Sequence, residues 1–127
     1  MASYRDLEVW QGAMDLVEQL YEITSRFPQT ERYGLVQQIR RAAVSVPSNI
    51  AEGHGRRTAK QRYNFLENAL GSVFELETQI DISRRLQMLS PDQADVLQDR
   101  IKGLGRGLTA LMRHVATQAK VEKPRFS

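Results

Sequence analysis

Apolar residues recur along this chain at steps of three and four, which is the spacing of one face of an α-helix. Four segments show this pattern, and they cover about residues 6–26, 30–53, 58–88 and 90–119. Short loops between long helices imply that helices consecutive in sequence pack antiparallel. The sequence therefore predicts an all-α protein, a single domain over residues 1–127 that forms an up-down-up-down four-helix bundle, with a tail over residues 120–127.

Capping residues support the predicted helix bounds. Thr58 and Ser90 each stand three residues before a glutamine, as in a capping box. Pro91 then occupies the first helical position, where proline is favourable. We expect Thr30 to cap the second helix. We also expect a left-handed residue in the glycine-rich segment 53–55 to close it.

The first helix carries two neighbouring apolar stripes, which predicts a wide buried face. One stripe consists of Trp10, Met14, Val17 and Tyr21, and the other of Val9, Ala13, Leu16, Leu20 and Ile23. The fourth helix carries one regular stripe, made of Ala94, Leu97, Ile101, Leu104, Leu108, Leu111 and Val115. These patterns predict a core to which all four helices contribute side chains.

The second helix carries Pro47 in the middle of its apolar stripe. Because proline removes a backbone hydrogen bond and crowds the preceding turn, at a cost of roughly 3 kcal/mol, we expect it to bend this helix. The side chains of Ser45, Ser48 and Asn49 can hydrogen-bond the backbone groups that the proline disturbs.

Two arginines precede this proline and have no acid three or four residues away in their own helix. We expect them to pair with carboxylates from elsewhere, namely Glu75, Glu77 or Asp81 of the third helix, or Glu52 of another subunit. The predicted structural network of the second helix consists of Arg40, Arg41, Pro47, Ser48, Asn49 and Glu52.

The charges are unevenly distributed along the chain, although the net charge is only +3. Residues 1–25 carry five acids against one arginine, and residues 100–127 carry seven bases against one acid. Residues 54–62 carry four bases and no acid. This asymmetry suits an anionic partner, but solvated helix ends produce similar patterns.

Two groups of basic residues are candidates for binding nucleic acid. The first lies in the turn before the third helix and in its first residues, and consists of Arg56, Arg57, Lys60 and Arg62. The second forms a stripe on the fourth helix at steps of four, seven and seven, and consists of Lys102, Arg106, Arg113 and Lys120. The dipole of a helix favours basic residues near its C-terminus, which is the competing explanation for the second group.

No motif of catalysis or metal binding accompanies these residues. The chain has no cysteine, and neither histidine follows a glutamate by three residues, as the metal ligands of di-iron bundles do. Nucleophile-elbow, phosphate-loop and dinucleotide patterns are also missing from the sequence. We therefore expect a protein that is not an enzyme, with no catalytic residues, no cofactor and no metal. The glycines of the fourth helix predict close approach of another helix, within the bundle or between subunits: Gly103, Gly105 and Gly107.

The N-terminus is polar, and no apolar run is long enough to cross a membrane. We expect a cytoplasmic protein with no membrane partner.

Five segments together carry a recognisable signature: 4–10, 31–35, 40–53, 65–72 and 75–77. Over about residues 4–118 the chain resembles a bacterial family of four-helix bundles, known from proteins encoded in intervening sequences of 23S ribosomal RNA genes. The resemblance implies a bundle that assembles as a ring-like homopentamer. Most members of this family have no established biochemical activity. A more distant similar protein, the accessory variability determinant of diversity-generating retroelements, is a basic pentamer that binds nucleic acid and its reverse transcriptase.

Two functional hypotheses follow. The first is a non-enzymatic oligomeric bundle that binds nucleic acid, RNA in particular, through its basic surface. The second is a scaffold for a protein partner encoded nearby, without binding of nucleic acid.

Overall fold

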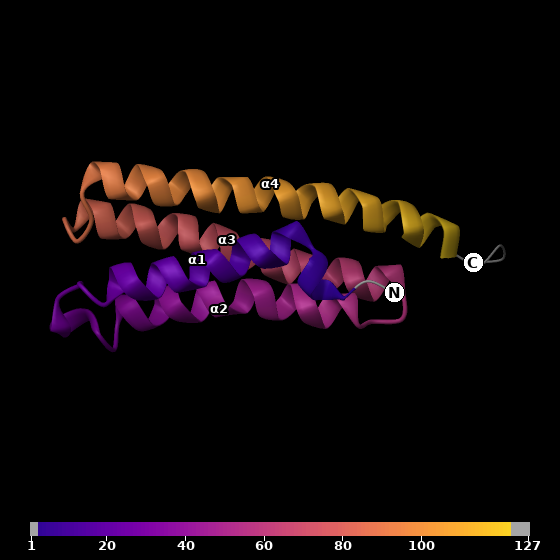
Figure 1. Ribbon diagram of the computed structural model, residues 1–127, viewed down its shortest axis with the longest axis horizontal. Helices are drawn as coiled ribbons and strands as arrows, with labels where there is room; N and C mark the ends of the chain where they lie inside the picture. The colour runs from indigo at the N-terminus through magenta and orange to yellow at the C-terminus, as the bar shows by residue number, and fades with distance from the viewer. Residues whose placement is uncertain (1–2, 123–127) are drawn as a thin grey trace.

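The computed structural model describes residues 3–122, and these residues form helices and connecting turns with no strand. Four long helices make up the fold: α1 (Glu8–Thr24), α2 (Leu35–His54), α3 (Ala59–Arg85) and α4 (Pro91–Glu122). Two short 3-10 helices precede α1 and α2: η1 (Tyr4–Asp6) and η2 (Gln29–Glu31). Successive long helices run in opposite directions (Figure 1), which confirms the all-α antiparallel bundle.

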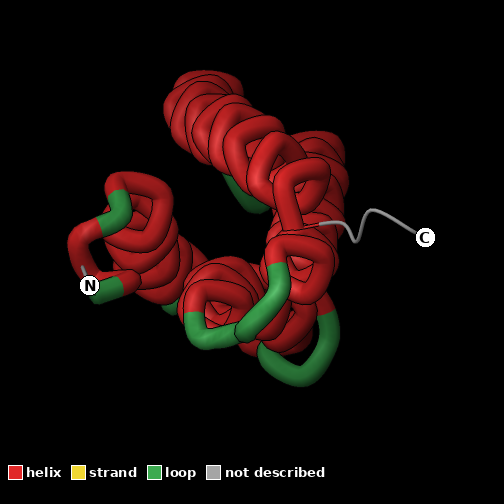
Figure 2. The backbone as a smooth tube through the Cα atoms, turned by 90° about the vertical axis from the view of Figure 1, so that its right-hand side faces the viewer, coloured by secondary structure: helices red, strands yellow, loops and turns green. Residues whose placement is uncertain are grey.

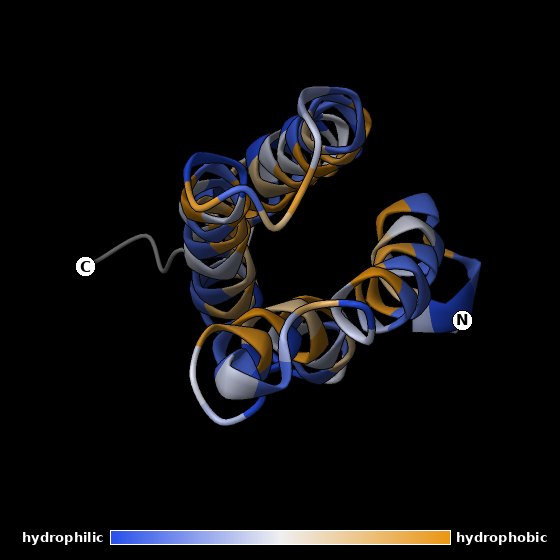
Figure 3. Ribbon diagram, turned by 90° about the vertical axis from the view of Figure 1, so that its left-hand side faces the viewer, coloured by the Kyte–Doolittle hydropathy of each residue, from blue (hydrophilic) through white to orange (hydrophobic). Residues whose placement is uncertain are grey.

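The four helices follow one another around an open arc when the bundle is seen from its ends (Figures 2 and 3). α2 packs extensively on α3, and α3 on α4, whereas α1 makes fewer contacts with α4 than with α2. α1 and α4 thus form the two ends of the arc, and α2 and α3 lie between them.

All four helices contribute to one apolar core. The largest side chains that are fully buried are Leu20, Ile39, Ile50, Leu76, Ile80, Leu97, Ile101 and Leu108. Burial of a side chain of this size is worth about 1.5–3 kcal/mol, so these positions hold the helices together. In α4 the predicted stripe is buried with one difference, since Leu111 is half-buried and its neighbour Met112 is buried.

Both predicted N-caps are present, and one of them, at Ser90, forms the full capping box. The Thr58 hydroxyl accepts a hydrogen bond from the Gln61 amide at 3.2 Å. At the start of α4 the contact is reciprocal: the Gln93 amide donates to Ser90 Oγ at 3.1 Å, and the Ser90 amide donates to Gln93 Oε1 at 3.0 Å. These bonds satisfy backbone amides that a helix N-terminus otherwise leaves without partners.

The predicted start and closure of the second helix are wrong. Thr30 lies in η2, and α2 begins at Leu35 after Gly34, with the Glu31 carboxylate accepting from the Leu35 amide at 3.4 Å. α2 ends at His54 without a left-handed glycine, since Gly55 has φ −83°. The left-handed residue stands instead after α3, at Gln87 with φ 62°.

Two glycines lie where neighbouring helices approach closely, and neither is needed for a turn of the chain. A Cβ atom on Gly53 would lie 2.8 Å from Phe65 Cβ of α3, and one on Gly107 would lie 2.8 Å from Val9 Cγ1 of α1. A side chain at Gly53 would therefore require α2 and α3 to move apart, and one at Gly107 would require at least Val9 to shift. A Cβ on Gly103 would meet only its own helix's Arg106, at 3.5 Å, so the expected close approach applies to Gly107 and not to Gly103.

The wide buried face predicted for α1 is only half correct. Ala13, Leu16 and Leu20 of the second stripe are buried. In the other stripe, Met14 is 38% exposed and Tyr21 42% exposed. Trp10 and Val17 of this stripe are half-buried against the core, and the Arg40 guanidinium of α2 lies over the Tyr21 ring at 4.5 Å, so the stripe is only partly exposed.

Pro47 is buried inside α2, which continues through it to His54. Ser48 Oγ donates to the Val44 carbonyl at 2.8 Å, and Asn49 Nδ2 donates to the Ser45 carbonyl at 2.8 Å. These bonds stay within the turns beside the proline, and neither reaches the Ala43 carbonyl, whose helical donor Pro47 removes. α4 is longer than predicted and includes residues 120–122, whereas the rest of the predicted tail, 123–127, lies outside the described residues.

Candidate nucleic-acid interface

The basic stripe of α4 lines a groove between α3 and α4. We call it the basic groove, a space of about 590 Å³ lined by Leu70, Phe74, Glu77, Lys102, Gly105, Arg106, Thr109 and Arg113. Three cations from α4 thus face one carboxylate from α3. A concave site with this excess of positive charge concentrates anions more effectively than scattered surface charges do.

The helical register explains how α4 supplies these cations. Its apolar stripe is buried, and Lys102, Arg106 and Arg113 lie on an adjacent exposed face at steps of four and seven. Among the described residues, the guanidinium groups of Arg106 and Arg113 make no hydrogen bond or ion pair. Both groups can therefore contact an external anion without first giving up a partner.

The basic turn before α3 is divided between structural and exposed residues. The half-buried Arg62 donates to the carbonyls of Arg56 and Arg57 at 3.1 and 3.2 Å, so it fastens the turn. Arg56 lies 4.0 Å from Glu52 and packs over the Phe65 ring at 4.7 Å. Arg57 and Lys60 are exposed.

The basic turn and the last turns of α4 meet at one end of the bundle. Arg62 Nη2 lies 3.5 Å from Gln118 Oε1, which joins the start of α3 to the end of α4. Lys120 is exposed two residues further along α4, outside the basic groove. The structure thus gathers Lys102, Arg106 and Arg113 in one groove, and it sets the remaining predicted residues beyond the groove's end.

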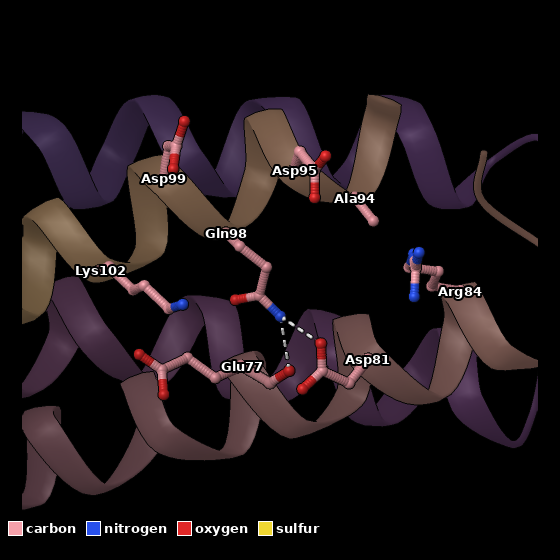
Figure 4. Close-up of a pocket in the computed structure, with 8 residues that line it drawn as sticks. All are labelled: Glu77, Asp81, Arg84, Ala94, Asp95, Gln98, Asp99 and Lys102. Atoms are coloured by element: carbon pink, nitrogen blue, oxygen red, sulfur yellow. Dashed lines mark hydrogen bonds between the residues drawn. The ribbon is translucent and has the colours of Figure 1, made fainter. Parts of the chain in front are cut away.

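A second groove between the same helices has the opposite charge. This acidic groove measures about 660 Å³ and is lined by Glu77, Asp81, Arg84, Ala94, Asp95, Gln98, Asp99 and Lys102. Gln98 crosses it (Figure 4): its Nε2 donates to the Glu77 carbonyl at 2.8 Å and to Asp81 Oδ1 at 3.0 Å. The side chains of Glu77 and Lys102 point into the space between the helices, where the two grooves adjoin.

Within the described residues, Arg40 does not pair with the expected carboxylates of the third helix. Its side chain binds the end of α1, with Nε donating to Thr24 Oγ1 at 3.0 Å and Nη2 donating to the Tyr21 carbonyl at 3.1 Å. The guanidinium also lies 4.5 Å from the centre of the Tyr21 ring. The Tyr21 carbonyl also accepts from the Ser25 amide, so Arg40 adds a second donor at the last turn of α1, where the helix dipole favours a cation.

The other members of the predicted network are dispersed. Arg41 and Glu75 line a polar groove between α2 and α3, and neither makes an ion pair within the part of the chain that is described. Ser72 Oγ donates to Ser45 Oγ at 2.9 Å and links these helices. Ser48 and Asn49 bond within α2, and Glu52 faces Arg56. One connected network is therefore absent from these residues.

Over residues 3–121, no group of three or more histidine, cysteine, aspartate or glutamate side chains is arranged to hold a metal ion. No described helix is both long and apolar enough to cross a membrane.

The family model of the 23S rRNA-intervening sequence protein matches residues 5–110. The chain belongs to this family. A crystal structure of a protein with unknown function, from the S23 ribosomal protein family of Bacteroides thetaiotaomicron VPI-5482, is similar to this family member with a TM-score of 0.74. The likeness covers 82% of this chain and 97% of the other at 17% sequence identity, so it concerns the fold. A comparison with curated proteins found no match.

In this member of the 23S rRNA-intervening sequence family, sequence reasoning missed the α3 side of the basic groove. Phe74 is 56% exposed, and it follows the core residue Val73 directly. A large aromatic residue outside its helix's apolar stripe is a signal that the sequence did contain. The position of Glu77 opposite Lys102 depends on how α3 and α4 pack, so no local pattern could have found it.

Proposed function

We propose that this protein binds nucleic acid, RNA in particular, without enzymatic activity, and that it acts in the cytoplasm as a homo-oligomer. The observation that carries the proposal is the basic groove, where Lys102, Arg106 and Arg113 face one carboxylate. Arginine is suited to phosphate because its planar donors match the phosphate oxygens in pairs. The family name refers to 23S rRNA, which makes RNA the first polyanion to test.

The oligomer in this proposal is a pentamer, the assembly that the sequence resemblance implies. Five copies at +3 each would carry about +15 and would repeat the basic groove five times. The partly exposed stripe of α1, which includes Met14 and Tyr21, is the surface we assign to contacts between copies. Light scattering at micromolar concentration tests this part, and a monomer would contradict it.

The test of RNA binding is the salt dependence of affinity for a structured RNA. We expect the Arg106→Glu/Arg113→Glu variant to lose at least about tenfold in affinity at low salt, because two phosphate contacts become repulsive. The slope of log affinity against log salt should become shallower. The affinity of an Arg56→Glu/Arg57→Glu variant tests whether the basic turn also contacts RNA.

The matched control is Arg84→Glu/Arg85→Glu. It changes the net charge by the same amount on exposed residues of α3, and Arg84 belongs to the acidic groove. We expect a much smaller loss for the control than for the groove variant. Equal losses in the two variants, or parental affinity in the groove variant, would rule out the basic groove as the binding site.

The second candidate function is a scaffold for a protein partner encoded nearby. The exposure of Phe74 and Met14 favours it, because exposed apolar side chains commonly mark protein contacts. If the protein is a scaffold, it should co-purify with one protein and show no salt-sensitive affinity for RNA. Sequencing the RNA and identifying the protein that co-purify from the native cell distinguishes the two functions.

A further inference from the structure

Phe74 is an aromatic residue that lines the basic groove, opposite the cations of α4, which suit phosphates. Its side chain is 56% exposed on α3, one helical turn after the half-buried Leu70. Exposing a phenylalanine to water is unfavourable. Phe74 lies outside the core, so core packing does not account for an aromatic residue here. Its ring is available to a ligand in the groove.

The opposite wall of the groove packs closely on the apolar residues beside Phe74. Gly105 of α4 has no side chain, and a Cβ atom there would lie at contact distance from α3, 3.5 Å from Val73 Cγ1 and 3.9 Å from Leu70 Cδ1. The neighbouring Thr109 hydroxyl donates to the Gly105 carbonyl at 2.9 Å, so its hydrogen is already engaged. The groove therefore has an apolar floor with few polar groups that require water.

The cations of α4 stand along the edge of this floor. Arg106 and Arg113 are seven residues apart, which places them about 10.5 Å apart along the helix axis. This separation exceeds one phosphate step of a helical strand, about 3.4 Å along its axis, so the two guanidinium groups can reach different phosphates. Two guanidinium groups can thus contact phosphates of one strand while a base between them reaches the floor.

We propose that the basic groove binds single-stranded nucleic acid, with an unpaired base stacked on Phe74 and phosphates bound by Arg106 and Arg113. This inference rests on the proposed function and narrows it from nucleic acid in general to unpaired strands. In a duplex the bases stack on one another and are closed to Phe74, so the ring contributes only to single strands.

The test compares a single-stranded oligouridylate of about ten nucleotides with a blunt RNA duplex of similar length. The key variant is Phe74→Leu, which keeps an apolar side chain but removes the flat aromatic face. We expect it to bind the single strand about fivefold more weakly or worse, as loss of one stacked base implies, and to bind the duplex within about twofold of the parent. Phe74→Tyr should restore parental affinity for the single strand.

A fluorescent version gives a readout that a purely structural role would not produce. Phe74→Trp in a Trp10→Phe background carries a single tryptophan, in the groove. Its fluorescence should be quenched by the oligouridylate and not by the duplex. Circular dichroism and thermal melting confirm that each variant is folded.

The outcomes separate the inference from the proposed function. Salt-sensitive binding of both RNAs with no effect of Phe74→Leu, or with equal losses for both, overturns the stacking inference alone. No salt-sensitive binding of either RNA overturns both. If an acidic amphipathic peptide binds in a Phe74-dependent way while neither RNA binds, the groove is a protein site and the inference is wrong.

Discussion

The basic groove and the acidic groove lie end to end between α3 and α4, share Glu77 and Lys102, and carry opposite charge. The basic groove has three cations and one carboxylate, whereas the acidic groove has four carboxylates and two cations. The net charge of +3 conceals this separation. Position along one face, and not total charge, decides where a polyanion can bind.

The grooves also differ in how they are built. Gln98 bridges the helices across the acidic groove with bonds to Glu77 and Asp81. The floor of the basic groove is made of Leu70, Phe74 and Gly105, and within the described part of the chain no hydrogen bond joins the two helices across it. One end is fastened by polar groups, and the other presents an apolar surface. A bound strand should therefore end near Lys102, where carboxylates begin to repel its phosphates.

Reversing the charge of the acidic groove should remove this difference. We expect Asp95→Lys/Asp99→Lys to tighten binding of a single-stranded RNA by about tenfold at low salt, because the strand can then continue past Lys102. The slope of log affinity against log salt should steepen by up to about 1.4, the value for two further phosphate contacts on a single strand. An unchanged slope would mean that the strand does not approach this groove.

Removing the bridge tests the structural half of the comparison. Gln98→Ala should lower the free energy of unfolding by about 1–2 kcal/mol, since it removes two hydrogen bonds between α3 and α4. RNA affinity should stay within about twofold of the parental value, because Gln98 lies outside the basic groove. Denaturant unfolding and a binding titration measure the two effects, and a large loss of affinity would contradict the division of roles.

Adding a methyl group to the floor of the basic groove should raise the stability of the fold while lowering the affinity for RNA. Gly105→Ala should raise the free energy of unfolding by up to about 1 kcal/mol, because alanine is the better helix former and its Cβ would meet Val73 at ordinary contact distance. Affinity for single-stranded RNA should fall slightly, since the methyl group occupies the floor. Thermal melting checks the first effect, and a lowered melting temperature would show that the glycine is needed for packing.

Neutralising the one carboxylate of the basic groove should have the smallest effect. Glu77→Gln should tighten RNA binding by about twofold to threefold at low salt, because one repulsive charge is lost from a half-exposed site. The gain should disappear at high salt. Asp81→Asn serves as the control, since Asp81 lines only the acidic groove, and an equal gain there would point to net charge alone.

The sequence predicted those features that depend on local patterns. Helical periodicity identified the four helices, and the Thr58 and Ser90 N-caps are present because each needs only residues three apart. Steps of four and seven grouped Lys102, Arg106 and Arg113, which line one groove, although Lys120 of the same predicted stripe lies outside it. These results require no knowledge of how the helices are packed.

The features that the sequence did not predict depend on contacts between helices. Arg40 binds the last turn of α1 because α2 lies alongside it, and Met14 is exposed because α1 stands at one end of the arc. The pairing of Phe74 with the cations of α4 likewise depends on the register between α3 and α4. No spacing within a single helix specifies such a register.

The most direct test of the basic groove is to map where RNA contacts the protein. A photoreactive single-stranded oligouridylate, crosslinked to the full-length protein and analysed by mass spectrometry of its peptides, identifies the residues touched. The account predicts crosslinks in the segments 70–77 and 102–113, with the yield lowered by Arg106→Glu/Arg113→Glu. Crosslinks confined to α1, or to the carboxylates at Asp95 and Asp99, would contradict it.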